Sequence, residues 1–190
     1  MLENLEKNLI EVKNASLELT LHNFERRKEC LEILSKKLNE NSENIININA
    51  RELEKSSTKG VDSHVLERMK ITKNTLQRMV DSLLTVSNLN DSVLEVIDTN
   101  FRENGLKVEK VRVPLGVLGV IFESRPNVVI EIASLAIKSG NGLVMRGGSD
   151  CIETNLALFK LVSESLKESG LPEKSMYFLD FTDRKAVNIL

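Results

Sequence analysis

One short segment in the second half of the chain combines the residue types that bind a phosphate group. It consists of Arg146, Gly147, Gly148 and Ser149. Consecutive glycines let backbone N–H groups approach a phosphate closely, the serine hydroxyl adds a donor, and a following helix would add its positive end. An arginine after the second strand of a dinucleotide-binding unit suits the 2′-phosphate of NADP, where NAD sites usually carry a carboxylate. The pattern predicts an NADP(H) site; a tight turn with a surface arginine is the alternative.

Three apolar runs after Pro114 are expected to be the strands that position this segment. They are residues 117–122, 142–146 and 176–179. The first run is continuously apolar, which is typical of a strand buried on both faces of a parallel sheet. Strands that alternate with helices form a doubly wound α/β sheet, whose ligands bind at its carboxyl edge. The loops 123–127 and 146–149 are therefore expected to lie at one edge.

The helices between these strands are expected from their apolar spacing and their terminal residues. Pro126 suits a helix start, and Gly140 and Gly170 suit helix ends. The residues expected to face the core are Val129, Ile132, Ala133 and Ala136 in the first helix and Ile152, Leu156, Phe159 and Leu166 in the second. Asp183 is the expected cap of a further helix. Residues 116–119 do not match the Gly-x-Gly-x-x-Gly fingerprint, so no standard dinucleotide motif is present.

Residues 1–92 are predicted to form a helical layer. Asn23, Ser42 and Thr72 are the expected starts of three of its helices. The apolar stripes consist of Leu2, Leu5, Leu9, Val12 and Leu19; Phe24, Leu31, Leu34 and Leu38; Ile45, Ile46 and Leu53; and Leu76, Met79, Val80 and Leu83. Such stripes at helical spacing are typical of helices that pack on a core.

Residues 93–113 are predicted to form a β-hairpin. The runs 93–97 and 106–113 are rich in β-branched residues and flank Asn104-Gly105, a pair that tolerates positive φ in a tight turn. The alternation of the second run slips near Glu109, which indicates a bulge there. The free strand edges need a partner, and another subunit would supply it, so the hairpin is the expected oligomerisation arm.

Composition and charge exclude several functional classes. The chain has 26 lysines and arginines against 28 acidic residues, a net charge of −2, so nucleic acid is not an expected partner. The N-terminus lacks a secretory signal, and the longest apolar run is too short to cross a membrane. Two cysteines cannot form a disulfide framework, so a cytoplasmic location is expected, and no metal is expected.

The segment 111–127 resembles the signature of gamma-glutamyl phosphate reductase, also called glutamate-5-semialdehyde dehydrogenase. Its sequence is Val-Arg-Val-Pro-Leu-Gly-Val-Leu-Gly-Val-Ile-Phe-Glu-Ser-Arg-Pro-Asn. The likeness continues at residues 47–51, 66–69, 138–142, 146–149, 170–172 and 182–184. The resemblance implies the aldehyde dehydrogenase fold and a homo-oligomer. It also implies NADPH-dependent reduction of gamma-glutamyl phosphate to glutamate 5-semialdehyde and phosphate, in proline biosynthesis.

The resemblance also implies roles for single residues. The segment 146–149 matches the loop expected near the adenosine end of NADPH. Asn127 matches the region where aldehyde dehydrogenases place an oxyanion-hole asparagine, which would stabilise developing negative charge. Arg125 either faces the acyl phosphate or pairs with Glu123. On this basis residues 114–190 are predicted to be a partial NADP-binding, Rossmann-like domain.

The family's nucleophile is a cysteine in a later, catalytic domain, which is expected to be absent from this chain. Cys30 falls on an apolar helix stripe and is expected to be a small core residue. Cys151 is expected in the first turn of a helix, where the dipole would lower its thiol pKa, but its sequence context does not match the nucleophile's. The chain therefore resembles a truncated reductase that is inactive alone. A non-catalytic remnant that binds nucleotide or docks onto subunits is the alternative.

Overall fold

A computed structural model describes residues 2–180, and its element order confirms the α/β fold class. The helices are α1 (Leu2–Leu21), α2 (Phe24–Glu40), α3 (Ser42–Thr58), α4 (Ser63–Met69), α5 (Lys73–Ser87), α6 (Asn127–Lys138) and α7 (Ile152–Glu168). The strands are β1 (Val96–Phe101), β2 (Lys107–Val111), β3 (Val117–Ile121), β4 (Gly142–Arg146) and β5 (Met176–Phe178). Two 3₁₀ turns, η1 (Ser149–Cys151) and η2 (Glu173–Ser175), complete the order. The predictions for Asp183 and for residues 182–184 lie outside the described residues.

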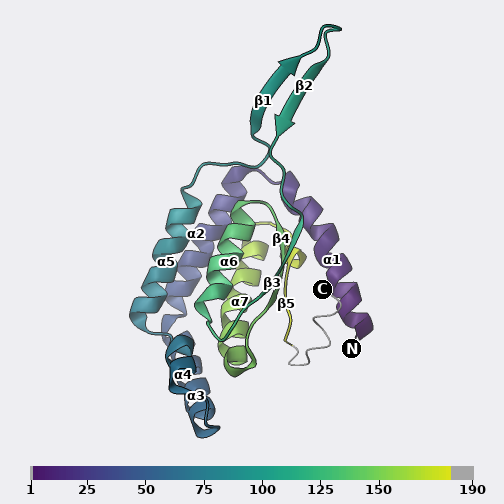
Figure 1. The fold of residues 1–190 in the computed structure, drawn as a ribbon. Helices are drawn as coiled ribbons and strands as arrows, with labels where there is room; N and C mark the ends of the chain where they lie inside the picture. The colour runs from purple at the N-terminus through teal and green to yellow at the C-terminus, as the bar shows by residue number, and fades with distance from the viewer. Residues whose placement is uncertain (1, 181–190) are drawn as a thin grey trace.

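The parallel sheet has the strand order β3-β4-β5, with α6 and α7 as the crossover helices. Alternate residues of β4 point to opposite faces of the sheet. Leu143 and Met145 belong to the large core that includes residues of α2, α5, α6 and α7, whereas Val144 packs with Leu5 and Val12 of α1. Figure 1 shows α1 alone on one side of the sheet and the other helices on the opposite side.

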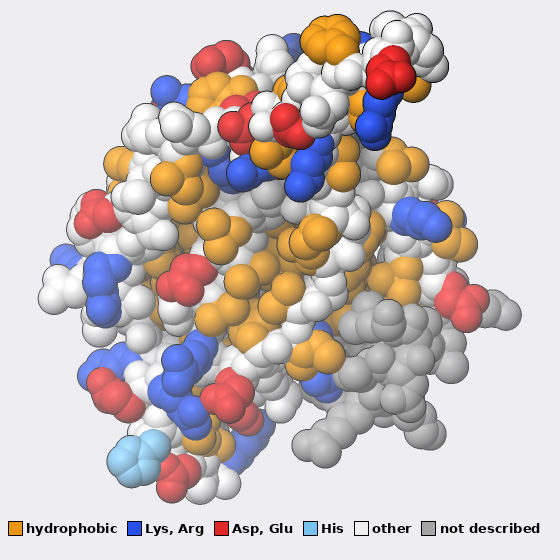
Figure 2. Space-filling view, turned by 45° about the horizontal axis from the view of Figure 1, so that its top comes forward, with side chains coloured by type: hydrophobic (Ala, Val, Ile, Leu, Met, Phe, Trp, Pro, Cys, Tyr) orange, Lys and Arg blue, Asp and Glu red, His pale blue; other side chains and the backbone are white. Residues whose placement is uncertain are grey.

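The expectation that the first parallel strand is buried on both faces is wrong for the described chain. In β3 the side chains of Val117 and Ile121 are exposed, the latter by 54%. β3 lies at the end of the strand order, and the helices leave the face that carries these two side chains largely uncovered, whereas Leu118 and Val120 on the other face pack against the large core. Leu17 and Leu115 join Val117 in an apolar groove beside this edge. Figure 2 shows hydrophobic side chains gathered across the middle of one face, below the hairpin.

The hairpin projects from the body of the molecule (Figure 1). Its first strand starts and ends later than the predicted run 93–97, and its second strand is shorter at both ends than the predicted run 106–113. The register slips between Val96 and Asp98, on the first strand and not near Glu109. Only Gly105 in the turn has a positive φ, of 83°, and its N–H donates to the carbonyl of Arg102. The turn is therefore a longer loop with glycine in the left-handed position, and not a two-residue Asn-Gly turn.

The predicted helix ends are confirmed where the signal is local. The Asn23 and Thr72 side chains accept hydrogen bonds from the N–H groups of Arg26 and Thr75 at the starts of α2 and α5. Ser42 begins α3, and Gly140 and Gly170 have φ values of 70° and 71° after α6 and α7. Both conformations favour glycine at a helix C-terminus.

The predicted buried face of α7 is partly wrong. Leu166 is buried, Ile152 and Phe159 are half-buried, and Leu156 is exposed. The core residues of this helix are Leu158, Leu161, Val162 and Leu166. The buried face of α7 is rotated relative to the prediction because it includes two polar residues, Thr154 and Asn155, which are completely buried. Thr154 donates a hydrogen bond to Glu52, and Asn155 donates one to the sulfur of Cys151.

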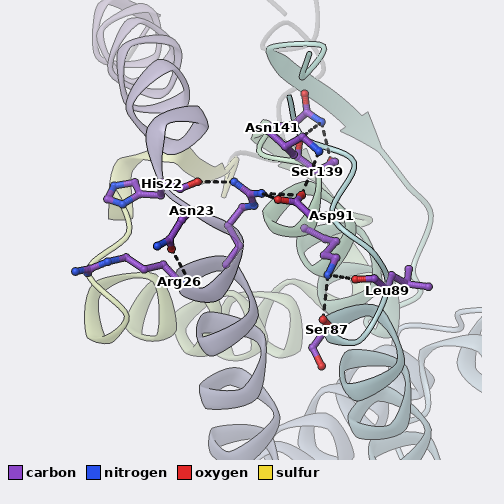
Figure 3. Close-up of polar contacts among 11 residues, drawn as sticks. His22, Asn23, Arg26, Ser87, Leu89, Asp91, Ser139 and Asn141 are labelled. Carbon is purple, nitrogen blue, oxygen red and sulfur yellow. Dashed lines mark hydrogen bonds and ion pairs between the residues drawn. The ribbon is translucent and has the colours of Figure 1, made fainter. Parts of the chain in front are cut away.

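A buried cationic cluster fixes the link between α5 and the hairpin. The Arg27 guanidinium donates to both carboxylate oxygens of Asp91 at 2.8 Å and to the carbonyl of His22. The Lys138 ammonium donates to the carbonyls of Ser87 and Leu89. Figure 3 shows these bonds converging from α2, α6 and the 88–93 link. Burial lowers the pKa of Lys138, and the Asp91 carboxylate opposes that effect.

None of the described helices is both long and apolar enough to cross a bilayer.

Candidate functional site

The two loops predicted to share an edge of the sheet are packed directly against each other. A Cβ atom at Gly148 would lie 2.9 Å from the backbone nitrogen of Ser124, and one at Gly147 would collide with the Asn155 side-chain amide of α7. Real Cβ atoms essentially never approach so closely. Neither glycine has a positive φ. Gly148 is therefore required by the close approach of the two loops and Gly147 by the close approach of α7, and no left-handed conformation is involved.

The predicted phosphate-binding residues lie together at the carboxyl edge of β4. Arg146 is the last residue of β4 and is half-buried, and its carbonyl accepts a hydrogen bond from the N–H of Phe122 at 3.0 Å. Ser149 is exposed and begins η1. The hydroxyl of Ser124 donates to Asp150 at 3.0 Å, which joins the two loops a second time. At this edge of the sheet the Ser149 side chain is therefore open to solvent, and the Arg146 side chain is partly covered.

The start of α7 is not open to a phosphate, contrary to the prediction. The Glu52 carboxylate, from α3, accepts hydrogen bonds from the N–H groups of Glu153 and Thr154 and from the Thr154 hydroxyl. Glu52 is only 4% exposed, and burial raises its pKa. Because those amides already have an anionic partner, the dipole of α7 is satisfied from within the protein. Asp150, which precedes the helix, accepts a hydrogen bond from Ser124 and does not cap α7.

Glu52 is the site residue that the sequence analysis missed. It lies next to the 47–51 segment, and Asn49 in that segment is also buried. The Asn49 amide donates to the carbonyl of Met69 and to the Thr154 hydroxyl, and it accepts from the N–H of Ile71. Asn49 and Glu52 stand one turn apart on the inner face of α3, so both reach the start of α7. The available signal was weak, because the buried face of α3 combines one apolar residue, Ile45, with the polar residues Asn49, Glu52 and Ser56.

Neither cysteine has the environment of a nucleophile. Cys30 and Cys151 are both fully buried, and burial raises the pKa of each thiol to about 12. The expectation that a helix dipole lowers the pKa of Cys151 is wrong, because desolvation outweighs it and the Glu52 and Asp150 carboxylates add to the rise. A thiol with such a pKa is almost entirely protonated at neutral pH, and the thiolate is the nucleophilic form.

Asn127 and Arg125 occupy different surroundings. Asn127 begins α6 and its amide donates to the Glu131 carboxylate at 2.9 Å. Glu123 forms its ion pair with Arg68 of α4, at 2.7 Å, and not with the side chain of Arg125. Arg125 is exposed, and its backbone N–H donates to the Glu123 carbonyl. The structure thus brings Asn127, but not Arg125, to a cavity between α4, α5 and α6.

No protein-family model matches the sequence. A gamma-glutamyl phosphate reductase of Clostridium botulinum is 41% identical over 176 residues, which are 93% of this chain and 42% of that protein. A crystal structure of gamma-glutamyl phosphate reductase from Thermotoga maritima matches with a TM-score of 0.93 at 37% identity, over 96% of this chain and 44% of that one.

A more distant structure shares the fold alone. A putative aldehyde dehydrogenase from Bacillus subtilis matches 97% of this chain with a TM-score of 0.73 at 21% identity. The aldehyde dehydrogenase-like fold is therefore common to neighbours whose sequences have diverged widely. The chain is related in sequence and in fold to gamma-glutamyl phosphate reductases, and it spans less than half of their length.

Proposed function

We propose that this chain forms the nucleotide-binding part of a gamma-glutamyl phosphate reductase of proline biosynthesis. The reaction is the NADPH-dependent reduction of gamma-glutamyl phosphate to glutamate 5-semialdehyde and phosphate. The name of the relatives and the extent of the match support this assignment. The observation that carries it is the packing of the 146–149 loop on the 123–127 loop at the carboxyl edge of the parallel sheet, where α/β folds bind nucleotides.

The residues at this edge fit a nucleotide with a 2′-phosphate. Arg146 ends β4, the position that usually carries a carboxylate when the ribose hydroxyl of NAD is bound. The adjacent carboxylate, Asp150, is tied to Ser124. Arg146 would bind the 2′-phosphate, and the Ser149 hydroxyl would add a donor. When bound, NADPH supplies the hydride for the reduction.

Asn127 is the proposed oxyanion stabiliser. Its amide stands at the start of α6, so its N–H groups and the positive end of the helix favour negative charge on a reacting carbonyl oxygen. The attack on the acyl phosphate requires a thiolate, and the pKa of each cysteine here is raised to about 12. We propose that the thiolate comes from the part of the relatives that this chain does not match. A nucleotide-binding module without turnover of its own is the second candidate.

Titration of the purified chain with NADPH, followed by nicotinamide fluorescence, tests this function. Arg146→Ala is expected to weaken NADPH binding by about tenfold, because a charge-assisted bond to the 2′-phosphate is lost, and to change NADH binding by less than about twofold. Lys160→Ala, an exposed lysine on α7, is the matched control and should not change either affinity. Equal weakening of NADPH and NADH in Arg146→Ala, or no saturable binding by the folded chain, would contradict the assignment.

We further propose that the hairpin is a subunit contact. Every residue of both strands is exposed, including Phe101 at 72%, and the hairpin stands clear of the body (Figure 1). Phe101→Glu is expected to weaken self-association by about tenfold or more, because an aromatic anchor is replaced by a charge. Light scattering over a concentration series measures the mass. Glu103→Ala, in the turn, is the control. A wild-type chain that stays monomeric throughout would refute the proposal.

A further inference from the structure

The cavity between α4, α5 and α6 is lined almost entirely by polar and charged residues. It has a volume of about 360 Å³, and its walls carry three cations and two carboxylates. The cations are Arg68, Lys70 and Arg78, and the carboxylates are Glu67 and Glu131. Asn127 also lines it, so the cavity adjoins the proposed oxyanion stabiliser. A cavity lined by both positive and negative side chains does not suit an apolar ligand. It suits a ligand that has both a negatively and a positively charged group.

The cations of the cavity are not equally available. Arg68 is paired with Glu123 at 2.7 Å. Within residues 2–180, Arg78 and Lys70 form no ion pair. Arg78 stands on α5 beside the hydroxyls of Thr72 and Thr75, which hydrogen-bond to each other at 3.0 Å. A guanidinium next to hydroxyl donors is the arrangement that binds a carboxylate.

The acidic side of the cavity adjoins Asn127. The Glu131 carboxylate accepts a hydrogen bond from the Asn127 side-chain amide at 2.9 Å, and Glu131 is exposed. A carboxylate in this position would attract an ammonium group and would keep the amide turned toward the cavity. One ligand that spans the cavity would then meet Arg78 with its carboxylate, Glu131 with its ammonium, and Asn127 with a carbonyl further along its chain.

We propose that this cavity binds the α-amino-acid end of the substrate, with Arg78 holding the α-carboxylate and Glu131 the α-ammonium. The inference rests on the proposed function, and it adds the specificity residues for the glutamyl group. Binding of the charged end in this cavity would leave the γ-acyl group beside Asn127. Recognition of both charges would explain how an amino acid is selected over a simple dicarboxylate.

Calorimetric titration of the chain tests the proposal with stable probes. L-Glutamate is the main probe, glutarate lacks the ammonium group, and inorganic phosphate tests for a plain anion site. L-Glutamate is expected to bind with an affinity at least about fivefold above glutarate, and Arg78→Met should weaken its binding by about tenfold. Glu131→Gln, which keeps the bond from Asn127, should remove the preference for L-glutamate. Lys73→Met, on the same helix but outside the cavity, is the matched control.

The outcomes separate this inference from the function on which it rests. Glutarate or phosphate binding as tightly as L-glutamate, or an Arg78→Met variant that binds like the parent, would overturn the cavity assignment. The absence of saturable L-glutamate binding would do the same. If NADPH binding that depends on Arg146 persists in those cases, only the cavity assignment is rejected. If NADPH binding is also absent, the proposed function fails as well.

Discussion

Replacing Asp91 with asparagine is expected to lower the free energy of unfolding by about 3 kcal/mol, because it leaves a buried guanidinium without its counter-ion. Arg27 is only 1% exposed, and both oxygens of Asp91 accept its N–H groups at 2.8 Å. Asp91 also favours the charged form of Lys138, which lies in the same cluster. The single substitution therefore leaves two cations in a poorly hydrated site. Urea denaturation followed by far-UV circular dichroism measures the change.

A second variant distinguishes loss of the charge pair from loss of packing. The Arg27→Met and Asp91→Leu double variant replaces both charges with apolar groups and is expected to recover most of the lost stability. Asp98→Asn, on the exposed hairpin, is the matched control and should change the free energy of unfolding by less than about 0.5 kcal/mol. A double variant that is less stable than Asp91→Asn would contradict this expectation. It would show that the Arg27–Asp91 ion pair stabilises the fold more than two apolar side chains do at the same positions.

The elements of this fold were predictable where their signals are local. Asn23 and Thr72 each cap a helix through an N–H group three residues away, so the sequence alone contains both partners. Gly140 and Gly170 end helices because their own φ is positive. The apolar run at 142–146 coincides with β4, because a central strand of a parallel sheet is apolar on both faces.

The errors arose where the outcome depends on a distant element. β3 has the composition of a strand buried on both faces, but the exposure of its side chains depends on which elements cover each face of the sheet. Leu156 fits a helical stripe, but α7 turns Thr154 inward because Glu52, more than a hundred residues earlier, binds it. A pair between Glu123 and Arg125 was one of the two alternatives for Arg125, whereas the ion-pair partner of Glu123 is Arg68 on α4. No periodicity within one segment encodes such contacts.

The candidate site was also predictable only in part. The 146–149 and 123–127 loops were expected at one edge, because the carboxyl ends of parallel strands share it, and they are in contact there. The cavity beside Asn127 was not expected, since Lys70 and Arg78 carry no motif and come from elements that precede the sheet by many residues. Its recognition required the three-dimensional packing of α4 and α5 on the start of α6.

Glu52→Ala is expected to lower the free energy of unfolding by about 3 kcal/mol, the sum of a lost helix cap and a buried Thr154 O–H donor left without an acceptor. The carboxylate accepts the first N–H groups of α7 and the Thr154 hydroxyl, and it is 4% exposed, so water cannot replace it readily. The control is Glu54→Ala, on the exposed face of α3, which should be neutral within about 0.5 kcal/mol. Equal effects of the two substitutions would show that the contacts of Glu52 contribute nothing.

The pH dependence of Glu52 reveals which of two opposing effects is larger. Burial raises its pKa, while the hydrogen bonds from Thr154 and Glu153 lower it, and burial prevails. The folded state then holds the proton more tightly than the unfolded state, so stability falls as the pH rises from the unfolded pKa through the raised pKa. Glu52→Gln cannot titrate. The stability advantage of the parent over Glu52→Gln should therefore be larger below that window than above it, as measured by urea denaturation across the pH range. An advantage that grows with rising pH would mean that the α7 amides favour the carboxylate more than burial penalises it.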